Sequence, residues 1–481
     1  MMFNTKDKLI NRVFEIFGEI CAIPHGSGDM EKIADYCVAF AKKNSLEYFR
    51  DTANNVIIYK NATKNYENSE PIILQGHLDM VCQKVSDSDF DFLTDSLNTF
   101  IDGDLLGAKD TTLGADNGIA VAFVLAILES DSVPHPYIEA VFTTDEEIGM
   151  LGAAQLDLKL LKSKKMINLD SEEDDTLTVS CAGGMDFKIE IPFEKVLSEG
   201  TEINIFFSGL KGGHSGVEID KNRVNADILA GKLLNHLKNT TDFELINIGG
   251  GDKGNAIPNR SEISLCTKKA SELINTCNSF LLDIKNDIKE NEPDFAFDIK
   301  KGEKATHGVI CETAKNDIIF LLNNFPNGVT QMSKEIEGLV ETSLNLGILL
   351  TDKECISVLF TLRSNKKTGM TALADKLTAL CSRIGCTYET GGYYPPWEFN
   401  NNSVLQKVYC KVFEEYYGKK PKVEAIHAGL ECAVFADKIA GLDCVSMGPN
   451  LYDVHTPNER LSISSATNTF NLLLEILKAC K

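Results

Sequence analysis

The stretch PIILQGHLD (71–79) decides the fold that this sequence predicts. Its apolar part is short enough for a buried strand and runs directly into His77, Leu78 and Asp79. Similar apolar runs are NVIIYK (55–60), YIEAVFTT (137–144) and KMINLD (165–170). Strands that are buried on both faces of a sheet read as continuous apolar runs. These runs therefore predict the strands of a mostly parallel sheet.

Helical stretches separate these strands, notably GIAVAFVLAILES (118–130) and EEIGMLGAAQLDLKLL (146–161). An alternation of strands and helices is typical of a doubly wound α/β domain. The end of the chain repeats the pattern with a helix, a strand and a helix: VLQKVYCKVFEEYYG (404–418), LDCVSM (442–447) and SATNTFNLLLEILKAC (465–480). We expect residues 1–186 and 398–481 to form one α/β domain.

The middle of the chain has a different pattern, in which apolar and polar residues alternate: DFKIEI, TEINIFFSG, RSEISLCTK and ISVLFTLRS. Alternation is typical of antiparallel strands with one solvated face. We therefore expect an inserted α+β domain over residues 187–397, with Gly- and Pro-rich junctions at 180–186 and 391–399. The order strand, loop and helix occurs twice within it, which suggests two related halves.

Composition excludes several classes of protein. The chain has 481 residues, with 48 Lys and Arg against 70 Asp and Glu, and the net charge of −22 argues against nucleic-acid binding. A hydrophobic share of 43% and a charged share of 25% are typical of soluble globular chains. No run is long enough to span a membrane, and MMFNTKDKLINRVFEIFGEI (1–20) has helical spacing unlike a signal peptide. We expect a cytoplasmic protein with no membrane partner.

The fourteen cysteines are scattered and include no Cys-x-x-Cys pair. We interpret them as reduced thiols that mostly fill the core. Cys381 and Cys386 are the nearest approach to a metal-binding pair, but no second pair completes a tetrahedral site.

Acids and histidines follow the predicted strands. In an open α/β sheet, ligands bind beyond the carboxyl ends of the strands, so these side chains should converge on one edge, as a metal site requires. The residues concerned are His77, Asp79, Glu146, Glu147, Asp170 and His455.

Each of these residues, taken alone, also has a structural interpretation. Asp116, in LGADNGIAVAF, stands where a helix N-cap is expected, and Glu146 and Glu147 suit the start of a helix. Asp79 lies two residues after His77, so in extended chain both side chains share a face and the carboxylate can hold one ring nitrogen. Only the set is specific: mixed oxygen and nitrogen ligands suit Zn²⁺, Mn²⁺ or Co²⁺.

Seven motifs occur in order between Ile23 and Arg460: GHLDMV, LGADNGIA, TTDEEIGMLGA, NLDSEE, GLKGGHSG, HAGLEC and VHTPNER. Together they resemble the dinuclear-metal aminopeptidase and aminoacylase superfamily. Within it, the chain is similar to the aminoacyl-histidine (Xaa-His) dipeptidases, which cleave carnosine-like dipeptides. The resemblance implies a metal-dependent dipeptidase with short peptides as substrates.

The resemblance also implies a role for each site residue. His77 and Asp170 would hold one divalent ion, Glu147 and His455 the other, and Asp116 would bridge them. Zinc is the expected metal, with manganese or cobalt as alternatives. Asp79 would orient His77, and Glu146 would be the general base that takes a proton from a metal-bridging water and passes it to the leaving amine.

The inserted domain would be a lid over this centre. By analogy, His214 would stabilise the oxyanion, Asn255 and Arg363 would hold the carbonyl region and terminal carboxylate of the substrate, and Glu431 would bind its free amine. A turn histidine, a strand-end asparagine and an arginine on a sheet face are the structural alternatives. Simpler relatives take the lid histidine from a second subunit, so a monomer and a homodimer through the lid, with His214 acting in cis or in trans, both stay open.

Three other functions compete. An N-acyl amino-acid hydrolase would use the same site on a substrate without a free amine. A non-catalytic protein that binds peptide or metal would lack the base or a ligand, whereas Glu146 and all five ligand positions are intact. A Cys–His hydrolase has no local signature in this sequence.

Overall fold

The structure is a computed structural model that describes residues 7–481, so the first residues of the predicted N-terminal helical stretch lie outside it. The chain divides into two compact units. Unit 1 holds residues up to 181 together with 399–425 and 430–481, and unit 2 holds 182–398 and 426–429. The main boundaries lie within five residues of the predicted junctions. The roles of catalytic domain and lid stay predictions.

The short segment 426–429 was predicted in the first domain, but it belongs to unit 2. Side-chain hydrogen bonds explain why. His427 Nε2 lies 2.7 Å from the Ser343 hydroxyl, and Asn365 donates to the carbonyl of Ile426 at 3.3 Å. A sequence pattern contains no sign of such contacts between distant segments.

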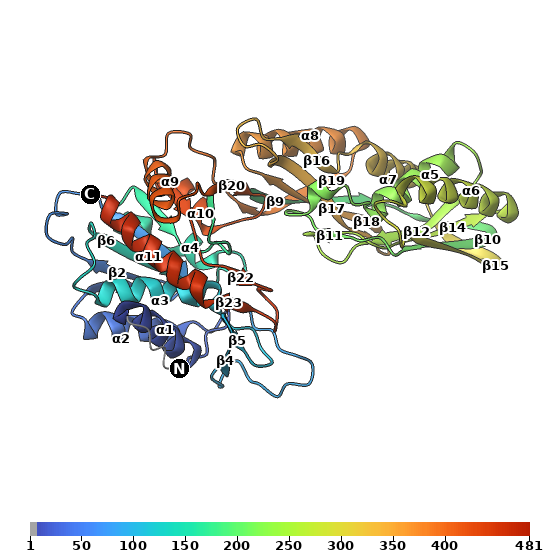
Figure 1. Ribbon diagram of the computed structural model, residues 1–481. Helices are drawn as coiled ribbons and strands as arrows, with labels where there is room; N and C mark the ends of the chain where they lie inside the picture. Colours follow the sequence, from blue (N-terminus) through green and yellow to red (C-terminus); the bar gives the residue numbers. More distant parts are fainter. Residues whose placement is uncertain (1–6) are drawn as a thin grey trace. The chain divides into compact units, whose positions relative to one another are not determined.

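Unit 1 is built on an eight-stranded sheet (Figure 1). In spatial order its strands are β1 (Glu47–Arg50), β2 (Val56–Lys60), β6 (Ile138–Thr143), β3 (Ile72–His77), β7 (Lys165–Asn168), β21 (Asp443–Ser446), β8 (Thr176–Cys181) and β20 (Lys422–Ile426). Strands β6, β3, β7 and β21 run parallel, whereas β1 and β2 are antiparallel to their neighbours and β8 is antiparallel to β21. The predicted α/β fold class is confirmed. The sheet is parallel only at its centre, and β2, which was predicted from NVIIYK as a strand of a mostly parallel sheet, is antiparallel to both of its neighbours.

Helices pack on this sheet. They are α1 (Lys8–Cys21), α2 (Glu31–Lys43), α3 (Ala115–Glu129), α4 (Leu151–Gln155), α9 (Val404–Tyr417), α10 (Glu431–Lys438) and α11 (Ile463–Ala479). Helix α3 is apolar on all sides, as a fully enclosed helix must be. It lies beside α11, where the rings of Phe123 and Phe470 are 5.3 Å apart (Figure 1). A small sheet of β4 (Thr99–Asp102), β5 (Leu105–Ala108), β23 (Arg460–Ser462) and β22 (Leu451–Tyr452) completes the unit.

The helix predicted over 146–161 is wrong for most of its length. Only α4 and a 3₁₀ turn at Leu158–Leu160 form there. Gly149 and Met150 adopt left-handed backbone conformations with φ of 115° and 57°, which a continuous helix excludes. Glu146 and Glu147 therefore stand in a loop beyond β6 instead of inside a helix.

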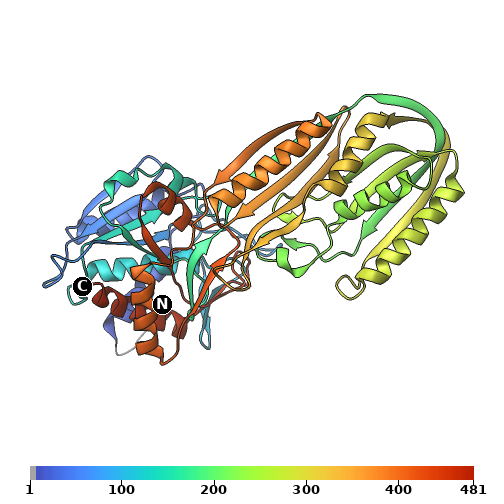
Figure 2. The same cartoon turned by 90° about the horizontal axis from the view of Figure 1, so that it is seen from above.

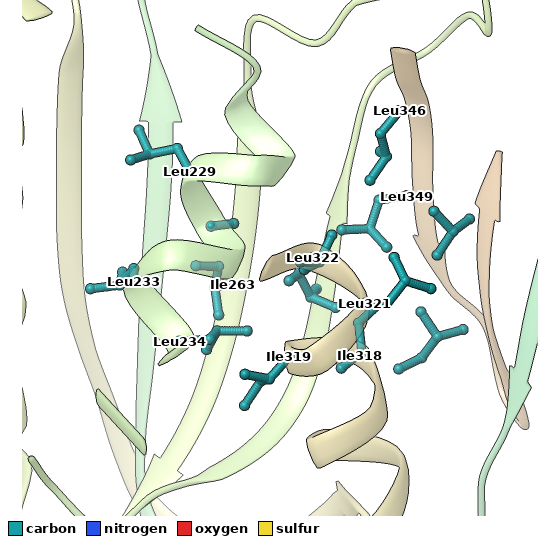
Figure 3. Close-up of a cluster of buried hydrophobic side chains, with 14 of the residues drawn as sticks. Leu229, Leu233, Leu234, Ile263, Ile318, Ile319, Leu321, Leu322, Leu346 and Leu349 are labelled. Carbon is teal, nitrogen blue, oxygen red and sulfur yellow. The ribbon is translucent and has the colours of Figure 1, made fainter. Parts of the chain in front are cut away.

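Unit 2 is an antiparallel sheet covered on one face by four helices (Figure 2). The strands follow the order β15 (Ala296–Ile310), β10 (Lys195–Ser208), β14 (Ser261–Thr267), β12 (Glu244–Gly250), β17 (Val340–Thr351), β18 (Cys355–Ser364), β9 (Gly183–Pro192) and β19 (Thr387–Tyr394), and β16 (Gly328–Met332) pairs with β17. The helices are α5 (Ala226–Lys238), α6 (Ala270–Ile288), α7 (Glu312–Asn324) and α8 (Lys367–Ile384). Leucine and isoleucine side chains of α5, α7 and the sheet interlock to form the core (Figure 3).

Asp227 makes the stability of unit 2 depend on pH. It stands in the first turn of α5 with no exposed surface, and burial raises its pKa to about 7 although the Ser261 hydroxyl favours the charged form. The folded chain therefore keeps a proton that the unfolded chain loses above its ordinary pKa of 3.8. Unfolding free energy should fall as pH rises between about 4 and 7 and level off above that window.

Asp227→Asn should remove the loss of stability that accompanies ionisation of Asp227. The free energy of unfolding should then rise by up to about 4 kcal/mol at pH 8 and change little at pH 4. Urea unfolding at both pH values measures the difference. An equal effect at both pH values would contradict the assignment.

Candidate metal centre

His77 is held so that one ring nitrogen is free to bind a metal. It ends β3, and its side chain is 1% exposed. Nδ1 lies 2.9 Å from the carbonyl oxygen of Asp79 and 3.4 Å from its Oδ1. A carbonyl oxygen only accepts, so Nδ1 carries a proton, and in the neutral ring that a metal binds the lone pair is on Nε2. Asp79, which is 1% exposed, thus stands where the sequence predicted the orienting group.

Asp116 lies between the two histidines. Its Oδ1 is 3.2 Å from Nε2 of His77, and its Oδ2 is 3.1 Å from Nε2 of His455. Asp170 Oδ1 is 3.4 Å from His77 Nε2, and Glu147 Oε1 is 2.9 Å from His455 Nε2. Three groups of possible metal ligands result: Asp116 belongs to two of them, and the third joins His77 to Glu146 and Glu147. The structure brings together all five predicted ligands, and their donor atoms lie within 4.8 Å of one another in each group.

Backbone geometry allows Asp116 to reach this position. The loop before α3 turns at Gly114, whose φ of 67° favours glycine, and the Asp116–Asn117 peptide bond is cis. The Asn117 side chain packs against Gly76 of β3, where a Cβ atom would clash with its Oδ1. Gly76 therefore lets the loop lie directly against the strand that carries His77.

The electrostatics of the cluster fit a pair of cations. Burial raises the pKa of Glu146 well above its usual range, and repulsion from Asp170, Glu431 and Glu147 adds to the rise, although His77 opposes it. Hydrogen bonds that the His455 ring donates to the carboxylates of Asp116 and Glu147 raise the pKa of His455 to about 11. So many buried acids require positive charge for balance, and the imidazole and carboxylate donors present are those that Zn²⁺, Mn²⁺ and Co²⁺ prefer. The residues therefore fit a dinuclear metal site.

Asp79 also fixes the loop that carries the two glutamates. The backbone N–H of Glu146 donates to its Oδ1 at 3.0 Å, that of Glu147 donates to its Oδ2 at 3.2 Å, and the Ser27 hydroxyl donates to Oδ2 at 2.8 Å. Asp79 thus positions His77 mainly through its carbonyl oxygen and the Glu146–Glu147 pair through its carboxylate.

A layer of buried, hydrogen-bonded polar side chains lies in the sheet next to the predicted metal ligands. Gln75 and Asn168 lie two residues before His77 and Asp170 on β3 and β7, and Asn168 donates to Gln75 Oε1 at 2.6 Å. Gln75 donates in turn to Thr143 of β6, and the Ser446 hydroxyl of β21 donates to Asn168. Sequence reasoning missed this layer, although polar residues inside apolar strands were a usable signal.

Glu431 belongs to the same layer. It begins α10 and has no exposed surface. Its Oε2 accepts hydrogen bonds from Gln75 and Thr143, whereas Oε1 has no hydrogen-bond partner among residues 7–481.

Sequence reasoning also passed over Glu459, which stands four residues after His455 in VHTPNER and is 2% exposed.

The remaining predicted residues lie in unit 2. His214, on β11 (Gly213–His214), faces Ala256 of β13 (Ala256–Ile257), so Asn255 is next to this pairing. Nδ1 of His214 accepts hydrogen bonds from the backbone N–H groups of Gly216 and Val217, both at 3.2 Å. The proton of the neutral ring therefore sits on Nε2. Burial and the nearby Arg363 lower the pKa of His214, which favours that neutral ring.

Arg363 is a buried cation with a neutral partner. Its side chain is on β18 and the residue is 7% exposed. Nη1 donates to the Tyr394 hydroxyl at 2.8 Å, and Nε has no hydrogen-bond partner among the described residues. His427 lies near it: burial and Arg363 lower the pKa of His427 to about 3.

Comparisons with known proteins agree with this geometry. The model of peptidase family M20/M25/M40 matches residues 73–479. The chain is 36% identical to the cytosol non-specific dipeptidase of Escherichia coli (strain K12) over 472 residues, which is 97% of either chain. The crystal structure of aminoacylhistidine dipeptidase from Vibrio alginolyticus superposes with a TM-score of 0.91 at 34% identity, covering 98% of both chains. An aminopeptidase from Bacillus cereus (TM-score 0.58, 16% identity, full coverage of both chains) shares the fold.

Proposed function

Because the chain belongs to peptidase family M20/M25/M40, we propose that it is a metal-dependent dipeptidase that cleaves short peptides with free termini, Xaa-His dipeptides foremost. The observation that carries this proposal is the position of Asp116, whose two oxygens face two separate ligand groups. The names of the relatives from E. coli and V. alginolyticus support dipeptides as substrates, and the name of the E. coli relative supports the cytoplasm as the compartment.

The five ligands named above would hold two divalent ions, zinc foremost. Such a pair would lower the pKa of a water molecule toward neutrality and polarise the scissile carbonyl. Glu146 accepts the proton of the attacking water and delivers it to the leaving amine. Its backbone is fixed by Asp79, so its carboxylate stays beside the ligands during both transfers.

Three of the groups proposed to recognise the substrate belong to unit 2, and the fourth, Glu431, belongs to unit 1. With the proton on Nε2, neutral His214 is a hydrogen-bond donor for the oxyanion, and Asn255 beside it holds the carbonyl region. Arg363 takes the terminal carboxylate, because the hydrogen-bond acceptor of its buried guanidinium among residues 7–481 is the neutral Tyr394 hydroxyl. Glu431 takes the free amine with Oε1, the oxygen that has no hydrogen-bond partner within the described part of the chain.

Hydrolysis assays on a matched panel test the proposal. β-Alanyl-histidine, several α-dipeptides and one N-acetyl amino acid are offered to the chelated protein after addition of Zn²⁺, Mn²⁺ or Co²⁺. We expect metal-restored cleavage of the free-amine dipeptides and a preference for a C-terminal His. Turnover of the acetylated substrate alone would replace the dipeptidase by an N-acyl amino-acid hydrolase, and no turnover with any metal would leave a non-catalytic protein.

Arg363→Met should raise KM for dipeptides with a free carboxylate by about 10- to 100-fold, since a charge-assisted hydrogen bond contributes about 1.5–3 kcal/mol. The same variant should treat dipeptide amides as the wild type does, because these lack the carboxylate. Initial rates on a dipeptide and its C-terminal amide measure both values. Lys367→Met, a change of one surface cation on α8, is the control. An equal loss on both substrates would contradict carboxylate recognition.

A further inference from the structure

Glu459 accepts hydrogen bonds from four consecutive backbone N–H groups. Oε2 accepts from Leu113 at 2.7 Å and from Gly114 at 3.0 Å, and Oε1 accepts from Ala115 at 2.8 Å and from Asp116 at 3.3 Å. Four converging N–H groups form a concave site for an anion, and the carboxylate of Glu459 fills it. The last donor is the backbone of Asp116 itself, so any movement of Glu459 is passed directly to that residue.

The segment that carries Glu459 also carries His455. Its turn is braced internally: Thr456 donates its hydroxyl to the carbonyl of Asp453 at 2.7 Å, and the N–H of Glu459 donates to the carbonyl of Thr456 at 3.1 Å. One rigid turn therefore fixes both the ligand His455 and the loop of the shared ligand Asp116.

From this geometry we propose that Glu459 is a positioning residue, which places the Asp116 carboxylate between two metal ions by holding the backbone of residues 113–116. The inference rests on the proposed function for the identity of the metal ligands. Asp116 must keep each oxygen within about 3 Å of a different histidine nitrogen. If the loop moves by a fraction of that distance, one of the two Asp116 oxygens no longer lies beside its histidine nitrogen. The sharing of Asp116 by two ligand groups is therefore the first feature to be lost.

A matched pair of variants separates positioning from stability. Glu459→Gln keeps the shape of the side chain, but its amide group is a donor and faces N–H groups that need an acceptor. The control is Glu139→Gln in the same unit. Glu139 is also fully buried and accepts backbone N–H groups of Lys162 and Ser163, but it lies at the start of β6, away from the ligands at the end of that strand.

Calorimetric titration of chelated full-length protein with Co²⁺ provides the readout. We expect Glu459→Gln to bind the second equivalent about 10- to 100-fold more weakly than the wild type, and Glu139→Gln to bind both equivalents normally even if its melting temperature falls. Wild-type affinities in Glu459→Gln, or an equal weakening in Glu139→Gln, would overturn the proposal. Should Glu459→Gln not fold, Glu459→Asp, which keeps the charge but is shorter, decides between the same two results. Because metal binding is measured without substrate, a wild type that cleaves no dipeptide would refute the proposed function and leave this result intact.

Discussion

Glu146→Gln is expected to lower kcat by about 10²- to 10⁴-fold, the usual contribution of a general base, while KM changes little. Glutamine keeps the size of the side chain and removes its ability to accept a proton. Glu146 also lies within reach of His77 and Glu147 in a third group of possible metal ligands, so a second measurement is needed. Metal content by atomic absorption should stay at two ions per chain.

The control for this variant is Glu173→Gln, which makes the same change on an exposed residue of the DSEEDD stretch and should retain full activity. If Glu146→Gln loses a metal ion together with activity, Glu146 is a ligand instead of the base. A variant with normal kcat would refute both roles.

Chelation should abolish activity and also lower the melting temperature of unit 1. The ligand cluster holds Asp116, Glu147 and Asp170 nearly buried beside Glu146, and without cations these carboxylates repel one another. An ion present at 1,000 times its dissociation constant stabilises the folded state by about 4 kcal/mol. In calorimetric scans, chelator should therefore lower the temperature of the unit 1 transition and leave the temperature of the unit 2 transition unchanged.

Asp116→Asn serves as the matched control for chelation, since it removes the shared charge without changing the size of the side chain. Its melting temperature should respond less to chelator than that of the wild type. Return of activity on addition of Zn²⁺, Mn²⁺ or Co²⁺ excludes irreversible damage. Full activity in metal-free protein would contradict the assignment of the centre.

Much of the centre was predictable because strand ends can be read from sequence. His77 and Asp170 directly follow apolar runs, and parallel strands bring their carboxyl ends to one edge of the sheet. Among residues 7–481, no helix has the length and apolar character that a membrane span requires. The loop at Glu146 was misread as a helix, because helical periodicity continued through residues whose backbone turns left-handed.

The sequence by itself determined the α/β class, the family and the residue types of the centre, because these depend on local periodicity and on motifs of a few residues. Only the tertiary structure decided how those residues are held. The carbonyl of Asp79 decides which ring nitrogen of His77 is available to a metal ion. Two backbone N–H groups decide which ring nitrogen of His214 carries the proton. The carboxylate of Glu459 accepts hydrogen bonds from backbone N–H groups that lie more than 340 residues earlier in the chain. Such contacts leave no periodic pattern in the sequence.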